Sequence, residues 1–460
     1  MPVRIIPGTD LPYYLLSYDQ NGHERAEADG SRLSTVVRAV AAETAEPVTD
    51  IFLASHGWQG DLNGAIDQYD RWFAAMTEMT ADRAAARAKV PGFRSLVIGV
   101  HWPSKPWGDE RMPNPGVLSR EEDDQEQAGD PQALIESYAA RIADTPQARA
   151  AIGLIVEAAT GAPGSATLTP QLHTAYTALY AESGLDAADA AGPPGTDQDG
   201  FDPQLIIDEA KNPEGADVAS AAVGPGVLGG GGGFRLRDLL LAPLRQLSFW
   251  KMKARACSFG ETGAHDLVAA LQVAAPTARI HLMGHSFGCI VVSAAVAGRS
   301  GGTALGRPVD SLFLVQGALS LWSMADDVPY APGSAGYFAR ILSDDLVKGP
   351  IVTTRSSHDT AVGRFYPLGA QIKRQFLLGP QDFPKYGGVG TFGLQGLAVT
   401  AQDQPIQGET FGYGFRGHAV YNIDASAVIA KDEGIPGAHN DIAHPRVAHV
   451  QWQAALALPA

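Results

Sequence analysis

The sequence predicts an α/β fold, in which a mostly parallel central sheet is flanked by helices and interrupted by one large helical insertion. Short runs of apolar and β-branched residues alternate with helical segments in the first hundred residues and again after about residue 250. One of these runs leads directly into a tight turn and a helix of small residues at 279–297. Residues 105–247 lack this alternation and contain several helix-start signals.

The first strands of the expected sheet are residues 49–54, which end at Ser-His-Gly-Trp, and residues 95–100, which end at His-Trp-Pro-Ser. The segment between them predicts a helix, because apolar side chains recur on one face at Ile66, Tyr69, Phe73 and Met76. Further strands are expected at 312–315, 351–354 and 419–423. Strands that alternate with helices in this way are typical of a parallel sheet.

The insertion is expected to be helical, because four of its segments start with a capping residue and a proline at the first helical position. These starts are Asp130-Pro131, Thr145-Pro146, Thr169-Pro170 and Asp202-Pro203. An acidic run at 121–124 and five glycines at 229–233 predict mobile joints.

We therefore expect residues 1–104 and 248–460 to form the two parts of a core, with 105–247 inserted between them. We interpret the insertion as a cap or lid over the site, and a helical decoration remote from the site is the alternative. The Gly- and aromatic-rich residues 387–417 predict either a loop or hairpin that borders the site or a surface β element.

The turn at Gly284-His285-Ser286-Phe287-Gly288 is the most specific signal in the chain. A strand precedes it and a helix follows, and in such a turn only glycine fits two positions on either side of the serine. The strained backbone lifts the serine hydroxyl from the sheet, so Ser286 is the predicted nucleophile. The N–H of Phe287 is expected to face a developing oxyanion. A second match, around Ser300, follows a helix and is interpreted as a glycine-capped helix end.

A serine nucleophile needs a base to remove its proton and a carboxylate to orient that base. The carboxylate is expected just after a strand that follows the nucleophile. Asp359, after the strand at 351–354, is favoured, and the pair Asp326 and Asp327 after the preceding strand is the alternative. Asp424 lies inside a strand and is interpreted as structural.

The base is expected in the loop after the last strand, where His439 is favoured and His444 is the alternative. Asn440 or Asp441 would then begin the C-terminal helix. His439, His444 and His449 are spaced five residues apart, so no two share the four-residue spacing that suits metal ligands on a helix. We expect no metal site.

A second oxyanion donor is expected after the strand at 49–54, where Gly57 permits a turn and the N–H of Trp58 can face the oxyanion. The Trp58 indole is also a candidate wall of an acyl pocket. Gly57, His285 and Trp102 are further pocket candidates.

Together these motifs resemble the α/β-hydrolase superfamily over roughly residues 47–105 and 250–458, and within it a bacterial lipase- or esterase-like branch. The resemblance implies a catalytic triad and the absence of a metal or organic cofactor, with the triad members Ser286, Asp359 and His439. The expected activity is hydrolysis of small-molecule or lipid-like carboxylic esters through an acyl-enzyme. Alternatives are acyl transfer, thioester or amide cleavage with the same residues, and a non-catalytic binding protein. The insertion enters earlier in the chain than many caps of the superfamily do.

Composition excludes several other classes. The net charge of −16 disfavours nucleic acid as a partner, because the phosphate backbone would repel the chain. No apolar run approaches the roughly 20 residues of a membrane helix, and no secretory signal is visible, so a cytoplasmic location is expected. Two cysteines, Cys257 and Cys289, do not make a disulfide framework. The sequence gives no indication of oligomeric state.

Overall fold

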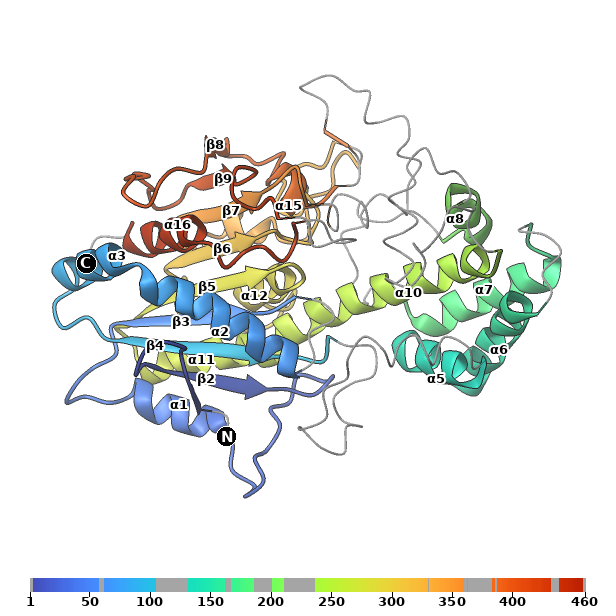
Figure 1. Cartoon of the computed structure of the whole chain (residues 1–460), viewed down its shortest axis with the longest axis horizontal. Helices are drawn as coiled ribbons and strands as arrows, with labels where there is room; N and C mark the ends of the chain where they lie inside the picture. The colour runs from blue at the N-terminus through green and yellow to red at the C-terminus, as the bar shows by residue number, and fades with distance from the viewer. Residues whose placement is uncertain are drawn as a thin grey trace. The chain divides into compact units, whose positions relative to one another are not determined.

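The computed structural model describes residues 3–57, 62–104, 131–161, 167–185, 201–210, 236–329, 331–359, 362, 383–384, 387–431 and 438–457. The chain divides into two compact units (Figure 1). The core unit comprises residues 1–104, 256–363 and 387–460, and the insertion unit comprises 105–255 and 364–386. The insertion therefore begins where it was expected but extends to residue 255, because the boundary falls inside the long helix α10 (Leu236–Phe259).

The core unit contains a nine-stranded sheet in the order β1-β2-β4-β3-β5-β6-β7-β9-β8 (Figure 1). Among the strands that the structure describes, β1 and β2 pair in antiparallel fashion, and the other neighbouring strands are parallel. The strands are β1 (Val3–Ile5), β2 (Pro12–Ser17), β3 (Asp50–Ser55), β4 (Ser95–His101), β5 (Arg279–His285), β6 (Ser311–Val315), β7 (Ile351–Arg355), β8 (Gln402–Pro405) and β9 (Val420–Asp424). The expected mostly parallel sheet is confirmed. The predicted strands lie within one residue of β3, β4, β6, β7 and β9, whereas β1, β2 and β8 were not predicted.

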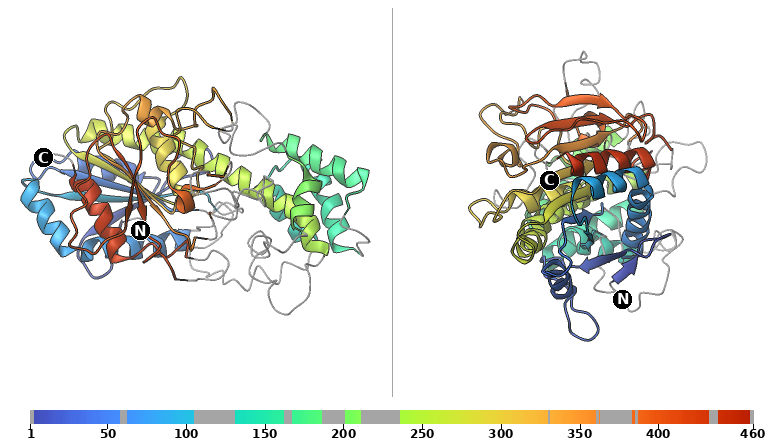
Figure 2. Two further views of the ribbon diagram at one scale, coloured as in Figure 1. Left: turned by 90° about the horizontal axis from the view of Figure 1, so that it is seen from above. Right: turned by 90° about the vertical axis from the view of Figure 1, so that its left-hand side faces the viewer.

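Helices cover both faces of the sheet (Figure 2). The helices α2 (Leu62–Glu78), α3 (Thr80–Lys89) and α16 (Pro445–Leu456) pack together on one face. On the other face lie α1 (Leu33–Ala41), α11 (His265–Ala274) and α12 (Gly288–Ala297). The π-helix η3 (Gly260–Ala264) precedes α11, and two short helices, α13 (Arg340–Ser343) and α15 (Val389–Phe392), lie in the connections that follow β6 and β7.

The C-terminal helix α16 is fixed to α2 through the main hydrophobic core. Tyr69, Phe73 and Met76 of α2 are buried as the sequence predicted, and Ile66 packs against them. The indole of Trp452 in α16 lies in the same core and donates a hydrogen bond to the Met76 carbonyl at 2.9 Å. Helix α16 is therefore anchored to α2 on this face of the sheet.

In the insertion unit, each predicted proline opens a helix. These are α5 (Pro131–Arg141), α6 (Pro146–Thr160), α7 (Pro170–Ser183) and α8 (Pro203–Ala210). Thr145 accepts the N–H of Ala148 at 3.1 Å, and Asp202 accepts that of Leu205 at 3.1 Å, as capping residues do. Asp130, the acidic run at 121–124 and the glycines at 229–233 lie outside the described residues.

Candidate active site

The candidate site lies where two neighbouring strands lead the chain in opposite directions across the sheet. From β3 the chain continues to β4 on one side, and from β5 it continues to β6 on the other. In open α/β sheets, ligands bind beyond the carboxyl ends of the strands at such a switch point. Gly57 follows β3 and Ser286 follows β5, so both lie at this edge.

Ser286 occupies the strained turn that the sequence predicted. Its φ is +57°, in the left-handed region that residues other than glycine rarely adopt. A Cβ on Gly284 would lie 2.5 Å from the Gly288 carbonyl oxygen, and one on Gly288 would lie 2.1 Å from that of Ser55. Neither separation is possible without movement of backbone, which explains both glycines.

The second match to the motif has the structure of a helix end, as expected. Helix α12 stops at Ala297, and Gly298 follows with a φ of +66°. Ser300 lies beyond it and is exposed. The two serines therefore differ in backbone conformation and burial, although their local sequences match the same pattern.

Asp359 and His439 are brought together by the fold, although 80 residues separate them in the sequence. The Nδ1 atom of His439 lies 2.8 Å from Oδ2 of Asp359, and both residues are buried. Because an ionised carboxylate can only accept a hydrogen bond, Nδ1 carries the proton, and we assign Nε2 of His439 as the unprotonated nitrogen. This tautomer is the one that can receive a proton from a serine hydroxyl.

The alternative acids lie elsewhere. Asp326 and Asp327 are exposed, and Asp327 accepts a hydrogen bond from the Gly333 N–H. Asp424 pairs with Arg355 at 3.2 Å at the ends of β9 and β7, which fits the structural role predicted for it.

The alternative base, His444, is the N-cap of α16, and its Nδ1 accepts the Arg446 N–H at 3.2 Å. The expectation that Asn440 or Asp441 begins this helix is wrong. The helix begins at Pro445, because the proline at the first helical position and the cap supplied by His444 give a stronger start signal.

The carboxylate of Asp359 is held by two further donors. The side-chain amide of Gln316 donates to Oδ2 at 2.8 Å, and the N–H of Val362 donates to Oδ1 at 3.0 Å. Gln316 has a φ of +46°, and its amide also donates to the Gly390 carbonyl at 3.1 Å. The acid is therefore fixed in one orientation. Gly390 belongs to residues 387–417, so this segment borders the site, as a loop with a short helix and the edge strand β8.

The segment that contains Gln316 also holds the nucleophile. The N–H of Ser286 donates to the Val315 carbonyl, and the Ser286 carbonyl accepts the N–H of Ala318, both at 3.1 Å. Three residues at the end of β6 and just after it, Val315, Gln316 and Ala318, thus contact the backbone of the serine and the side chain of the acid. Sequence reasoning missed Gln316, because only acidic residues were sought at strand ends.

His285 connects the turn to the loop that carries His439. Its Nδ1 lies 3.0 Å from the Gln68 amide nitrogen, and its Nε2 lies 3.0 Å from the His439 carbonyl oxygen. Burial and the adjacent His439 ring lower the pKa of His285 well below 6.5. A neutral ring that accepts at Nδ1 and donates at Nε2 satisfies both contacts. His285 is buried, so it supports the loop and is not an open pocket wall.

The loop after β3 lies against the serine. A Cβ on Gly57 would lie 2.6 Å from the Ser286 Cβ, so only glycine permits this approach. The Nδ1 of His56 lies 2.9 Å from the Gly57 carbonyl oxygen, and its Nε2 lies 3.0 Å from Nδ1 of His101. The fully buried Trp102 stacks on His56 with ring planes 7° apart, so it supports this loop from behind.

Of the two predicted oxyanion donors, one lies in the described residues. Phe287 is buried and is the N-cap of α12, whereas Trp58 lies outside the described residues. Among the contacts of the described residues, the Ser286 hydroxyl makes no hydrogen bond to His439. Such catalytic hydrogen bonds are often long without substrate and shorten when it binds.

His281 lies at the opposite edge of the sheet, where its ring contacts Ser311 and Asp50 at 2.8 and 3.1 Å. Both ring nitrogens are engaged within the core, so His281 is a structural residue of the sheet.

Among the described residues, no helix is both long enough and apolar enough to cross a membrane. Comparisons of the chain with protein-family models, with curated proteins and with solved structures found no match.

Proposed function

We propose that this protein is a serine hydrolase of the α/β-hydrolase superfamily that cleaves carboxylic esters through an acyl-enzyme. The observation that carries the proposal is the buried hydrogen bond between Asp359 and His439, formed beyond the carboxyl ends of β7 and β9. Ser286 follows β5 at the same edge of the parallel sheet, with the backbone conformation of a nucleophile turn. The chain order of serine, acid and histidine is that of the superfamily.

In the proposed reaction, Ser286 Oγ attacks the ester carbonyl carbon while His439 Nε2 takes the hydroxyl proton. The carbonyl oxygen becomes an oxyanion, and its collapse expels the alcohol, which receives the proton from His439. Water then attacks the acyl-serine with His439 again as base, which releases the carboxylic acid and restores the serine. Asp359 remains ionised throughout and stabilises the imidazolium.

The oxyanion is proposed to bind the N–H of Phe287 and that of Trp58. The Phe287 N–H lies at the amino end of α12, where the helix dipole favours negative charge. Loss of one such donor typically costs about 3 kcal/mol of transition-state stabilisation.

The proposal is tested with a fluorophosphonate probe and a panel of p-nitrophenyl esters of increasing acyl length. We expect the probe to label Ser286, located by mass spectrometry, and Ser286→Ala to abolish both labelling and turnover. Ser300→Ala is the matched control, because it removes the serine of the second motif and should leave both intact. The proposal would be refuted if Ser286→Ala hydrolysed esters at the wild-type rate. It would also be refuted if the folded wild-type protein neither reacted with the probe nor hydrolysed any ester.

We also propose that the insertion unit acts as a cap. It leaves the core at residue 105, shortly after Trp102, whose ring stacks on the His56 beside Gly57. The chain therefore departs from the core next to the proposed site. Deletion of residues 113–233 should raise turnover of short-chain esters relative to long-chain ones, and an unchanged acyl preference in a folded variant would argue against a cap.

A further inference from the structure

A cavity lies at the opposite edge of the sheet from Ser286. Its volume is about 330 Å³, and its lining includes Pro12 and Tyr14 of β2, Phe52 of β3, and Ser95 and Val97 of β4. These residues lie in the amino-terminal halves of parallel strands, whereas the proposed catalytic residues follow the carboxyl ends. The cavity therefore belongs to a different part of the core unit.

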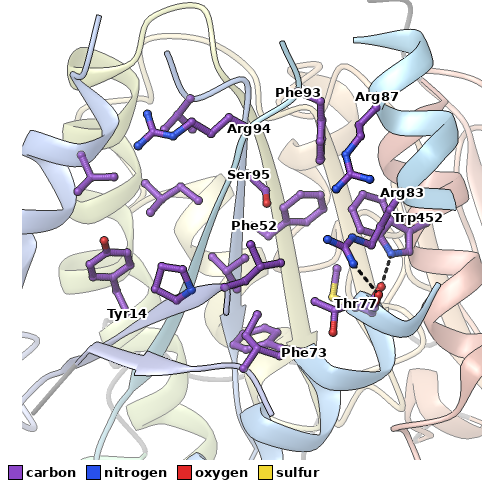
Figure 3. Close-up of a pocket in the computed structure, with 18 residues that line it drawn as sticks. Tyr14, Phe52, Phe73, Thr77, Arg83, Arg87, Phe93, Arg94, Ser95 and Trp452 are labelled. Atoms are coloured by element: carbon purple, nitrogen blue, oxygen red, sulfur yellow. Dashed lines mark hydrogen bonds between the residues drawn. The ribbon is translucent and has the colours of Figure 1, made fainter. Parts of the chain in front are cut away.

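The walls of this cavity are mainly aromatic and aliphatic (Figure 3). Phe52, Phe73 and Trp452 come from the buried core, while Phe93 is half-buried beside them. Leu11 lines the cavity and is 37% exposed, so the cavity opens to solvent. Apolar walls with a few convergent polar groups are typical of small-molecule sites, and the volume is at the lower end of their range.

The polar groups of the cavity are strongly cationic. Arg83, Arg87 and Arg94 contribute to the lining, and among the described residues no Asp or Glu does. Within the described part of the chain none of the three forms an ion pair, although the protein as a whole has a net charge of −16. Arginines left without carboxylates around an apolar cavity favour an anionic ligand.

Two of these arginines converge. Arg83 and Arg87 extend one turn apart from α3 toward the same side of the cavity, and Arg94 approaches from the other side (Figure 3). Arg83 donates to the Thr77 carbonyl at 2.9 Å, and Arg94 donates to that of Glu46, so both are fixed, whereas Arg87 is exposed. Burial and the charge of Arg87 lower the pKa of Arg83. An oxyanion between the two would relieve their repulsion and accept hydrogen bonds from both.

We propose that this cavity binds an amphiphile with an oxyanion head and an apolar body, the head held by Arg83 and Arg87 and the body by Phe52, Phe93 and Trp452. The ligand class follows from the cationic rim and the aromatic interior together. Simple inorganic anions would leave the apolar walls unused, and uncharged hydrocarbons would leave the arginines unpaired. The proposal does not depend on the hydrolase activity.

The test is isothermal titration of the full chain with decanoate, decyl phosphate and decanol. We expect both anions to bind more tightly than decanol, and the stronger of the two identifies the preferred head group. Arg87→Gln should weaken anion binding roughly tenfold or more, since one charge-assisted hydrogen bond is lost. Arg38→Gln is the matched control, because Arg38 is also an exposed arginine in the last turn of a helix but does not line the cavity.

A second variant, Leu11→Trp, narrows the mouth of the cavity at an exposed position and should also weaken binding. To distinguish this cavity from the proposed catalytic site, the titration is repeated with Ser286→Ala and with enzyme treated with fluorophosphonate. Both samples should still bind the anionic amphiphiles. Equal affinity for decanoate, decyl phosphate and decanol, or undiminished binding by Arg87→Gln, would overturn the proposal, as would loss of binding after fluorophosphonate labelling.

Discussion

The imidazole of His285 lies 3.0 Å from the backbone carbonyl of His439, so the residue before the proposed nucleophile holds the loop of the proposed base. The two rings lie 4.9 Å apart between centroids. This contact joins segments that are 154 residues apart in the chain. It gives His285 a positioning role that its place in the motif does not reveal.

His285→Leu should reduce kcat/KM about 10-fold to 100-fold, because a buried carbonyl left without its donor costs about 1–3 kcal/mol. His285→Gln retains an amide donor and should restore much of the activity. The measurement is kcat/KM across the pH range, in which a displaced His439 should also shift the apparent pKa of the rate profile. Equal losses in both variants with an unchanged profile would indicate a purely structural role.

Asp359→Asn should lower kcat by about 10³-fold to 10⁴-fold with little change in folding, because the amide removes the charge that stabilises the imidazolium and favours the wrong tautomer. Asp326→Asn changes an exposed alternative and should have no effect. The two variants are compared by steady-state kinetics with one activated ester, and circular dichroism checks that both are folded. A mild effect at Asp359, or a severe one at Asp326, would contradict the assigned acid.

Gly57→Ala should abolish most ester turnover, since the added methyl group would lie 2.6 Å from the Ser286 Cβ. Gly408→Ala is the control, because a Cβ there meets nothing within 4 Å and the φ is not positive. Turnover and fluorophosphonate labelling should both fall for the first variant only. Normal labelling of Gly57→Ala would mean that the loop after β3 can move away from the serine.

His449 should make the free energy of unfolding depend on pH. Burial lowers its pKa, but hydrogen bonds to Asp82 and to the Phe411 carbonyl, with the charges of Asp82 and Glu409, outweigh burial and raise the pKa above 6.5. The resulting stabilisation is complete below about pH 6.5 and is lost as the pH rises through the folded-state pKa. Urea unfolding of the wild type and of His449→Gln should therefore show a difference that shrinks with rising pH, and a constant difference would contradict the assignment.

Local signals explain what could be predicted from the sequence. Apolar runs give β3, β4, β6, β7 and β9 within one residue, and proline after a capping residue gives the helix starts of the insertion unit. The strand β2 escaped prediction because its place beside β4 depends on pairing between residues 13–17 and 97–101, which no local pattern encodes. At the last helix, the Asn440-Asp441 signal was misleading and His444-Pro445 was the true start.

In the candidate site, the pairing of Asp359 with His439 was predictable from chain order. The supporting contacts of Gln316 and of His285 were not, because each joins residues that are distant in the chain. Gln316 and Asp359 are 43 residues apart, and Gln68 and His285 are 217 apart. Gln316 stands at the end of a strand and Gln68 on the surface of a helix, and no local sequence pattern predicts such roles for them.

The contacts of Val315, Gln316 and Ala318 have a consequence for motion during turnover. These residues bind both the Ser286 peptide and the Asp359 carboxylate, so those two groups are attached to the same short segment of chain. His439 is bound to that carboxylate, and its carbonyl is bound to the residue before the serine. The backbone of all three residues is therefore already held in place, and rotation of the Ser286 side chain is enough to bring its hydroxyl closer to the imidazole.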